Sequence, residues 1–332
     1  MKADKILRSE EWLCHRCSTA LGFKPINEVN GAVRRECANC GDFGWCRPRG
    51  DFVLSEPSPT LHLANDRKTR AYPAQDNTFG LPAGPLDKGG SCPWCTRGKG
   101  GCFHIPEGRK SPTCYAWNIM QAFRGAGANL RANMDAIAKE SMGGPERIAS
   151  KLCGMIAAFA MKTENYARIK KIDPKPLMKF RIHWAGDMYS ADYAKAWAET
   201  CRRFPGVSFW TYTRSYRLAK HLVGIPNLKL YLSLDEDSWE RGMREFFKLG
   251  GNGDPRLGVA IMAKSEDFID KCMEKMEKFP DRYGPRDEVS AFTRTVPLSR
   301  CPVDLGKMPL TGACCKCRMC ISPGAQLLWF KC

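Results

Sequence analysis

The sequence lacks the long apolar run of a membrane-spanning helix and the apolar stretch of a secretory signal. No segment approaches the roughly 18 uninterrupted apolar residues that a bilayer span requires. Residues 1–11 mix charged and apolar side chains and contain no apolar core for a signal peptide. These two absences predict a cytoplasmic protein without a membrane partner, in a compartment where thiols stay reduced.

Acidic residues are scarce relative to basic ones. The chain has 35 of the former against 52 of the latter, which gives a net charge of +17. A surplus of this size favours a polyanionic partner, and nucleic acid, either DNA or RNA, is the first candidate. The alternative is a basic but inert surface that only keeps the protein in solution.

Cysteine, in contrast, is abundant, with 18 in 332 residues, and most of these thiols fall into three clusters. In a reducing compartment clustered thiols indicate metal ligands, whereas a disulfide framework would require secretion. The clusters divide the chain into a zinc ribbon at residues 1–50, an α/β domain at 51–300 that contains the cysteine loop 91–114, and a C-terminal cysteine cluster at 301–332.

The first cluster consists of two C-x₂-C pairs, Cys14 with Cys17 and Cys37 with Cys40. Each pair can direct two thiolates at one tetrahedral Zn²⁺ ion, and the second pair closes the site. A site closed by four protein ligands has no open position, so its predicted role is structural. The alternative is a redox or adventitious set of thiols.

The second cluster comprises Cys92, Cys95, Cys102 and Cys114. Their irregular spacing matches no standard zinc finger, and the glycine-rich filler 98–101 suits a loop that wraps tightly around a cofactor. These features favour an iron–sulfur cluster held by three or four of the thiols. A second structural zinc is the alternative.

The third cluster has the spacing C-x₂-C-x₂-C at Cys314, Cys317 and Cys320, with Cys301 upstream as a fourth ligand. Three closely spaced thiolates and a distant one are typical of loops that bind a [4Fe–4S] cluster. A zinc site would use the same four residues, and the spacing favours neither metal.

Hydrophobic periodicity predicts two long helices followed by alternating strands and helices. The long helices are expected at 115–139 and 145–172, after a short strand at 78–82. The alternation that follows implies a parallel sheet covered by helices. Strands are expected at 179–185, 207–213, 228–234 and 257–262, and helices at 192–204, 216–223, 238–247 and 265–279.

Polar side chains follow three successive strands of this predicted sheet. Asp187 follows the first strand, Thr213 and Arg214 the second, and Asp235 the third. Because parallel strands place their carboxyl ends along one rim, we expect these groups to converge there. Asp187 and Arg214 are the catalytic candidates. The alternative is that Asp187 and Ser190 cap the next helix, and His183 is expected to be a core residue.

Six motifs carry a resemblance to a known family. Over roughly residues 60–325 the chain resembles the phage gene-product-eighty-eight-like proteins and, more distantly, phage proteins of the radical S-adenosylmethionine (SAM) barrel superfamily. The motifs are Leu81-Pro-Ala-Gly, Ser91-Cys-Pro, Cys114-Tyr-Ala, Arg181-Ile-His-Trp-Ala-Gly-Asp-Met-Tyr-Ser, Phe209-Trp-Thr-Tyr-Thr-Arg-Ser and the cysteine tail that begins at Cys301-Pro.

The distant resemblance implies a partial (β/α) barrel of the radical-SAM type. It also implies that the second cluster binds a [4Fe–4S] cluster and SAM as cofactors, although its spacing differs from the superfamily's C-x₃-C-x₂-C. Asp187, Thr213 and Arg214 would then line the pocket for SAM or substrate. The C-terminal thiolates would hold an auxiliary cluster or zinc.

Two functions follow from these expectations. The first is an Fe–S enzyme that uses SAM to modify nucleic acid or a nucleotide-derived substrate. The second is a non-enzymatic nucleic-acid-binding protein of phage or plasmid origin, in which every metal site is a structural zinc site. A phage origin would place either protein in the host cytoplasm.

Overall fold

The computed structural model describes residues 60–251, 253–321 and 326–331, together with five short strands nearer the N-terminus. β1, β4 and β3 form one antiparallel sheet, and β2 pairs with β5. The predicted zinc ligands Cys17, Cys37 and Cys40 lie outside the described residues, and Cys14 is described only as the last residue of β1. The strands are β1 (Trp12–Cys14), β2 (Phe23–Pro25), β3 (Val33–Glu36), β4 (Phe43–Pro48) and β5 (Phe52–Leu54).

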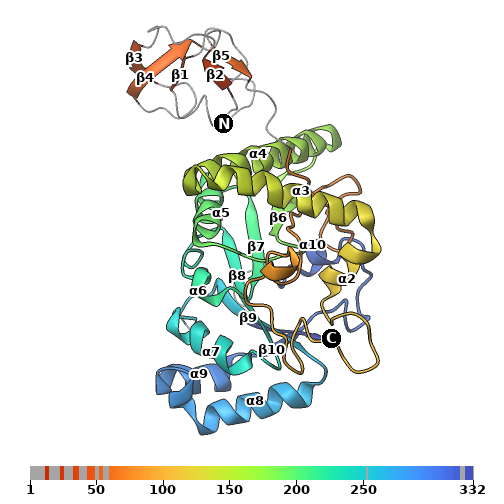
Figure 1. Ribbon diagram of the computed structural model, residues 1–332. Coiled ribbons are helices and arrows are strands. Elements are labelled where there is room, and N and C mark those ends of the chain that lie inside the picture. Colours follow the sequence, from red (N-terminus) through yellow and green to blue (C-terminus); the bar gives the residue numbers. More distant parts are fainter. Residues whose placement is uncertain are drawn as a thin grey trace.

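A six-stranded parallel sheet forms the centre of the described domain (Figure 1). The strand order is β10-β11-β9-β8-β7-β6, and every neighbouring pair is parallel. The predicted α/β fold is thus confirmed, and the sheet as described is open, because its outer strands β10 and β6 do not pair with each other. The strands are β6 (Lys179–Ile182), β7 (Ser208–Thr213), β8 (Leu228–Asp235), β9 (Leu257–Ala263), β10 (Leu298–Arg300) and β11 (Leu327–Lys331).

The segment before the cysteine loop extends this sheet beyond β6. Thr78 forms a parallel bridge with Arg181, and the amide of Phe79 donates to the Arg181 carbonyl at 3.1 Å. Further along, the amide of Leu81 donates to the carbonyl of Ala185 at 3.0 Å. The strand predicted at 78–82 therefore lies alongside β6, and the cysteine loop leaves the sheet at its carboxyl edge.

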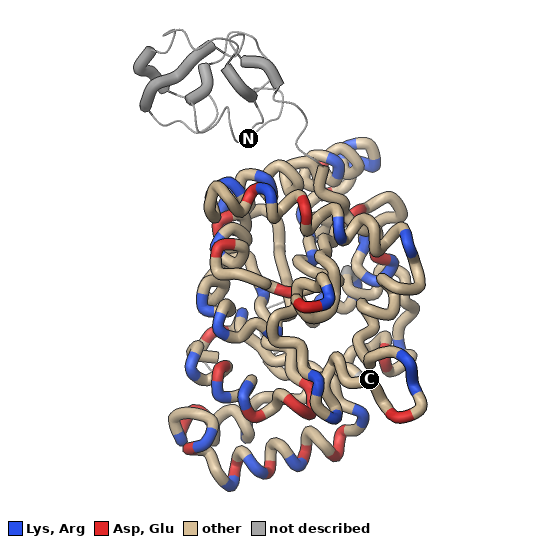
Figure 2. The backbone as a smooth tube through the Cα atoms, viewed as in Figure 1, with Lys and Arg blue, Asp and Glu red and all other residues tan. Residues whose placement is uncertain are grey.

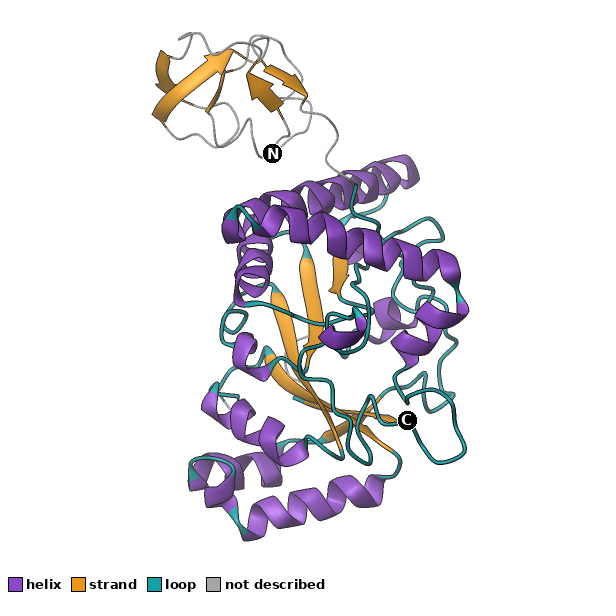
Figure 3. Ribbon diagram, in the orientation of Figure 1, coloured by secondary structure: helices purple, strands orange, loops and turns teal. Residues whose placement is uncertain are grey.

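Helices fill the connections between the strands (Figure 3). The single helix predicted at 115–139 is wrong: the chain is divided at Phe123, whose backbone is extended (φ −116°, ψ 95°). Among the described helices, none is both long and apolar enough to span a bilayer. The α-helices are α2 (Tyr115–Ala122), α3 (Arg124–Ser141), α4 (Gly144–Lys170), α5 (Ala191–Arg203), α6 (Tyr216–Ala219), α7 (Trp239–Lys248), α8 (Glu266–Lys278), α9 (Arg286–Thr295) and α10 (Ala313–Cys317), and the 3₁₀ helices are η3 (Leu86–Lys88), η4 (Lys175–Leu177) and η5 (Pro280–Arg282).

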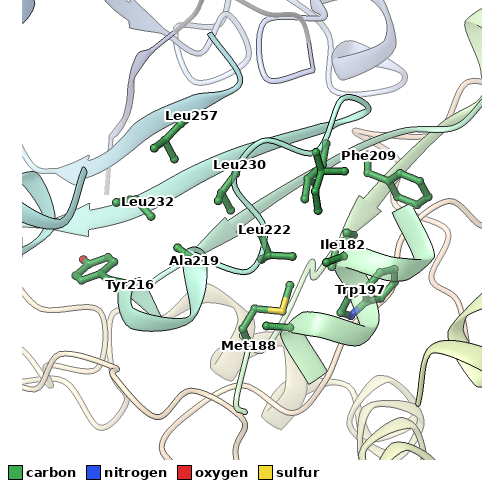
Figure 4. Close-up of a cluster of buried hydrophobic side chains, with 14 of the residues drawn as sticks. Ile182, Met188, Trp197, Phe209, Tyr216, Ala219, Leu222, Leu230, Leu232 and Leu257 are labelled. Atoms are coloured by element: carbon green, nitrogen blue, oxygen red, sulfur yellow. The ribbon is translucent and has the colours of Figure 1, made fainter. Parts of the chain in front are cut away.

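One face of the sheet is covered by helices because β6 to β9 follow one another in sequence. Parallel crossovers are right-handed, so successive connections between adjacent strands deliver their helices to the same face. Leu230 and Leu232 of β8 belong to the same buried core as Ile182 of β6 and Trp197 of α5 (Figure 4). Each such side chain contributes about 1.5–3 kcal/mol when fully buried.

The opposite face of the sheet is covered by the cysteine-rich C-terminal segment. Side chains alternate along a strand, so Tyr231 points away from the core that Leu230 and Leu232 enter. With Ala260 of β9 and Leu328 of β11 it forms a separate cluster, against which Met319 and Cys320 pack. The described residues after β10 thus join the sheet in two ways, since they supply β11 as well as this cover.

Candidate functional site

All the cysteines of the second and third clusters line one cavity of about 640 Å³. The cavity also receives side chains that follow the carboxyl ends of β6 and β7, among them Asp187 and Arg214. The sequence predicted two separate metal sites, and the structure places the cysteines of both sets around a single space. The middle set is Cys92, Cys95, Cys102 and Cys114, and the C-terminal set is Cys301, Cys314, Cys317 and Cys320.

The loop of the middle set begins against the segment that follows β6. The Ser91 hydroxyl donates to the Pro82 carbonyl at 2.9 Å and accepts from the Asp187 amide at 3.2 Å. Gly186 has a φ of +80°, and a Cβ there would collide with the Ser91 hydroxyl and lie 2.8 Å from Leu81. Only glycine allows both this backbone conformation and this close approach. The Ser91-Cys-Pro and Gly186-Asp motifs are therefore two sides of one contact.

The same loop is fastened to the end of β8 by one carboxylate. Asp235 is 1% exposed, and its Oδ2 accepts from the Thr96 hydroxyl at 2.5 Å and from the Cys102 amide at 2.9 Å. Arg214 Nη1 donates to this Oδ2 at 2.5 Å. A further carboxylate, Asp237, accepts from the Gly98 amide at 3.2 Å. Strand-end acids thus hold the backbone of the cysteine loop in place.

Asp187 joins the end of β6 to the end of β7. Its carboxylate accepts from the Thr213 hydroxyl at 2.5 Å, the Arg214 amide at 2.8 Å and its neighbour's amide, Met188, at 2.7 Å. Burial raises the pKa of Asp187, and these hydrogen bonds oppose the rise. The expected convergence of Asp187, Thr213 and Arg214 is observed. Asp187 does not cap the next helix, because Ser190 accepts from the Tyr193 amide at the start of α5.

Each cysteine set has an arginine beside it, buried in the case of Arg214 and partly buried in the case of Arg181. Burial alone would lower the pKa of Arg214, but the neighbouring Cys102 and Asp235 outweigh burial and raise that pKa. Burial likewise acts to lower the pKa of Arg181. Its neighbours Tyr115, Tyr212, Asp66 and Cys314 outweigh burial and raise that pKa. Arg214 is thus a cation beside the middle set, and Arg181 and Lys68 are cations beside the C-terminal set.

The C-terminal set is held against the turn at residues 66–70. The Gly312 amide donates to the Arg67 carbonyl at 2.8 Å, and the Cys314 amide donates to the Lys68 carbonyl at 2.9 Å. Cys301 directly follows β10, so it also lies at the carboxyl edge of the sheet. Backbone hydrogen bonds from α10 and its flank therefore position this set.

Several thiols of the two sets are poor anions without a metal. Burial, followed by the charge of Asp187, raises the pKa of Cys92, and burial raises that of Cys114. Burial and Cys320 raise the pKa of Cys314 to about 12, and burial raises that of Cys320 to about 11. Metal binding would therefore displace protons from these thiols.

The donor chemistry of the two sets fits a thiolate-bound metal. Soft sulfur ligands in groups of four suit zinc or an iron–sulfur cluster. In the part of the chain that the structure describes, no three Cys, His, Asp or Glu side chains are grouped closely enough to hold an ion. The two sets therefore have the type and number of ligands that a metal requires. Their thiols, however, lie apart along the cavity wall and are not grouped around one point.

Arg181 is a cavity residue that we did not single out from the sequence. Its side chain lies within 3.7 Å of Asp66, donates to the Tyr115 hydroxyl at 3.2 Å and faces the Tyr212 ring at 5.6 Å. The signal was present: an arginine between Phe180 and Ile182 interrupts an apolar strand, as a residue directed away from the core would.

His183 is a core residue, as expected. Its Nε2 lies 2.8 Å from the Tyr193 hydroxyl, and its ring lies near those of Phe79 and Trp197. A φ of +62° ends β6 at this point and turns the chain, so the strand is shorter than the predicted 179–185. Burial, together with the charge of Arg181, lowers the pKa of His183 to about 3.

Comparisons with known proteins agree with the motifs. The sequence model of the Gene product 88 family matches residues 58–323. The chain is 31% identical over 192 residues to the Gene 88 protein of Mycobacterium phage D29, which is 54% of this chain and 69% of that protein. It is 31% identical over 191 residues to the Gene 88 protein of Mycobacterium phage L5, with the same shares. No solved structure matches, and the distant relation to radical SAM proteins stays a prediction. The chain belongs to the Gene product 88 family.

Proposed function

We propose that the protein is an Fe–S enzyme that uses SAM and acts on nucleic acid or a nucleotide-derived substrate. The observation that carries this proposal is the single cavity lined by both cysteine sets at the carboxyl edge of a parallel sheet. Parallel α/β sheets place their chemistry at this edge. We further propose that the open sheet, whose crossover helices pack into one core on one face, is a partial (β/α) barrel of the radical-SAM type.

In this proposal the middle set holds a [4Fe–4S] cluster through three of its four thiols. When bound, such a cluster supplies the single electron that cleaves SAM. Arg214 places a positive charge beside these thiols, while Asp187 and Thr213 fix the strand ends that form the pocket for SAM or substrate. The C-terminal set would hold an auxiliary cluster or zinc with all four of its thiols.

The test is anaerobic purification with measurement of iron, sulfide and zinc. Single Cys→Ala changes at 92, 95, 102 and 114 should leave cluster assembly intact at one position and abolish it at the other three. Added SAM should alter the electron paramagnetic resonance spectrum of the reduced cluster. Zinc alone in every form, or a spectrum that SAM leaves untouched, would remove the mechanism.

The second candidate function is a nucleic-acid-binding protein without catalysis, which the net charge of +17 favours. In the view of Figure 2 the basic residues are spread among acidic ones over the described helices and loops, so this proposal depends on total charge. Binding through charge should weaken steeply with salt, because bound phosphates release counterions. Affinity that stays flat between 50 and ~200 mM salt would exclude it.

The first cysteine cluster enters both candidate functions as a structural zinc site. Cys14, Cys17, Cys37 and Cys40 have the ligand types and spacing for one tetrahedral ion. Changing Cys37 to Ser in the full chain should lower the zinc content by about one equivalent. Unchanged zinc in that variant would contradict the assignment.

A further inference from the structure

The cavity between the two cysteine sets has the size of a small-ligand site. Its volume of about 640 Å³ lies inside the range of roughly 300–1,000 Å³ typical of such sites. A single nucleotide is compatible with this volume, whereas a nucleic-acid helix is too wide. The occupant that the cavity can accept is therefore a free small molecule or one residue of a longer chain.

Aromatic rings form much of the cavity wall. They come from the cysteine loop, α2, the sheet and the segment after β6. Stacking on such rings binds planar groups, and nucleobases above all. The wall consequently favours a flat ligand over an aliphatic one. The rings are those of Phe103, Tyr115, Trp184, Trp210, Tyr212 and Phe330.

The charged side chains of the wall favour an anion. Five of them are basic and three are acidic. Arg214 is held by Asp235 at 2.5 Å, so its charge is already matched at close range. Arg181 is different, because its nearest carboxylate, Asp66, lies 3.7 Å away. The basic residues are Lys68, Arg109, Arg181, Arg214 and Arg318, and the acidic ones are Asp66, Asp187 and Asp304.

Arg181 also has a buried donor without an acceptor. Its Nε is inaccessible to solvent and has no hydrogen-bond partner among the described residues. An unsatisfied buried donor costs about 1–3 kcal/mol, and such a group in a folded protein calls for a specific explanation. Because the Nε is closed to solvent, a ligand in the cavity would meet the guanidinium through its Nη groups, which lie 3.2 Å from the Tyr115 hydroxyl and 3.7 Å from Asp66. A planar guanidinium suits phosphate or carboxylate in particular.

We propose that the cavity binds a planar, anionic, nucleotide-sized ligand between the two cysteine sets, with Arg181 as its polar anchor. This inference rests on the cavity assigned above to the proposed enzyme, and it identifies the substrate class. The aromatic wall takes the base, and Arg181 takes the phosphate. A free nucleotide and a nucleotide turned out of a strand share this chemistry, and the experiment separates them.

The experiment uses full-length protein, purified anaerobically with its metals, and follows binding by calorimetry and tryptophan fluorescence. The probes are adenosine 5′-monophosphate, uridine 5′-monophosphate, uncharged adenosine and a single-stranded 12-mer. Both mononucleotides should bind at least about tenfold more tightly than adenosine, which corresponds to about 1.4 kcal/mol. If the 12-mer binds but the mononucleotides do not, and Arg181→Gln abolishes that binding, the ligand is a nucleotide within a strand.

The variant Arg181→Gln should remove the preference for the mononucleotides over adenosine. Arg244→Gln is the matched control, because that side chain is 54% exposed on α7. Should Arg181→Gln fold poorly by circular dichroism, Trp184→Leu tests the same site through the base and should weaken all probes together. Equal affinity for nucleotide and adenosine in the unchanged protein, or no binding of any probe, would overturn the inference.

Metal analysis of the same preparations separates this inference from the proposed enzyme. Nucleotide binding by protein that contains only zinc would support the ligand site and remove the Fe–S chemistry. Iron and sulfide in protein that binds no probe would support the Fe–S chemistry and reject the ligand site. Nucleotide binding that SAM abolishes would assign it to the SAM pocket and overturn a separate ligand between the sets.

Discussion

The two cysteine sets line the same cavity but are held in different ways. The middle set depends on buried carboxylates at strand ends, since Asp235 alone accepts from Thr96, Cys102 and Arg214. The C-terminal set depends on backbone hydrogen bonds, such as that from Cys314 to the Lys68 carbonyl. Side-chain substitutions should therefore displace the middle set selectively and leave the C-terminal set in place.

The largest expected effect that tests this difference is that of Asp235→Asn. Loss of the charge leaves Arg214 buried without its partner, and breaking a buried ion pair costs about 3–5 kcal/mol. We expect urea unfolding to show this loss, and metal content to fall to that of a variant lacking Cys92 and Cys95. Asp192→Asn, at a half-exposed position, is the control. A variant that kept its full metal content would show that the carboxylate does not hold the loop.

Asp187→Asn should have the next largest effect, about 2–3 kcal/mol on unfolding. In either orientation the new amide directs a donor at a backbone N–H that the carboxylate accepted, from Arg214 or from Met188. The middle set begins against this residue through Ser91. The C-terminal set should keep its metal in this variant. Loss of metal from both sets would show that the two sets are not held independently.

Local patterns predicted the parts of the fold that depend on few contacts. Buried runs located β7, β8 and β9, and the rule that parallel strands end on one rim brought Asp187 and Arg214 together. Cysteine spacing defined both sets, and their metal binding stays a prediction. Their shared cavity was not predictable, because it depends on β11, whose position between β9 and β10 is a long-range pairing that no local pattern encodes.

The helix break at Phe123 was missed for a related reason. Nothing in the sequence there forbids a helix, although Gly125 and Gly127 weaken one. The break brings α3 against α2, where a Cβ on Gly127 would lie 2.9 Å from the Met120 carbonyl oxygen. A tertiary approach of two helices therefore decides the local structure.

A smaller effect on stability is expected from the protonation of His183, which lies at the carboxyl end of β6. Its pKa of about 3 in the folded state lies below the value of ~6.5 in an unfolded chain. The unfolded chain therefore binds more protons between these values, and stability falls as the pH drops below ~6.5. The loss approaches ~1.4 kcal/mol per pH unit.

His183→Asn should flatten this pH dependence, because asparagine tolerates the positive φ and does not titrate. Urea midpoints at pH 7.5 and 5.5 measure the change. His62→Asn, at an exposed position, should keep the slope of the unchanged protein. An equal slope in all three proteins would mean that His183 is protonated in the folded state.

The smallest effect is expected on the side of the C-terminal set, from Tyr231→Phe. The Tyr231 hydroxyl donates to the Met319 carbonyl at 3.4 Å, a long hydrogen bond next to Cys320. Its loss should cost about 0.5–1 kcal/mol, while the ring keeps its packing. Because backbone contacts position this set, its metal content should be unchanged. Loss of metal from the C-terminal set in this variant would show that it, like the middle set, depends on single side chains.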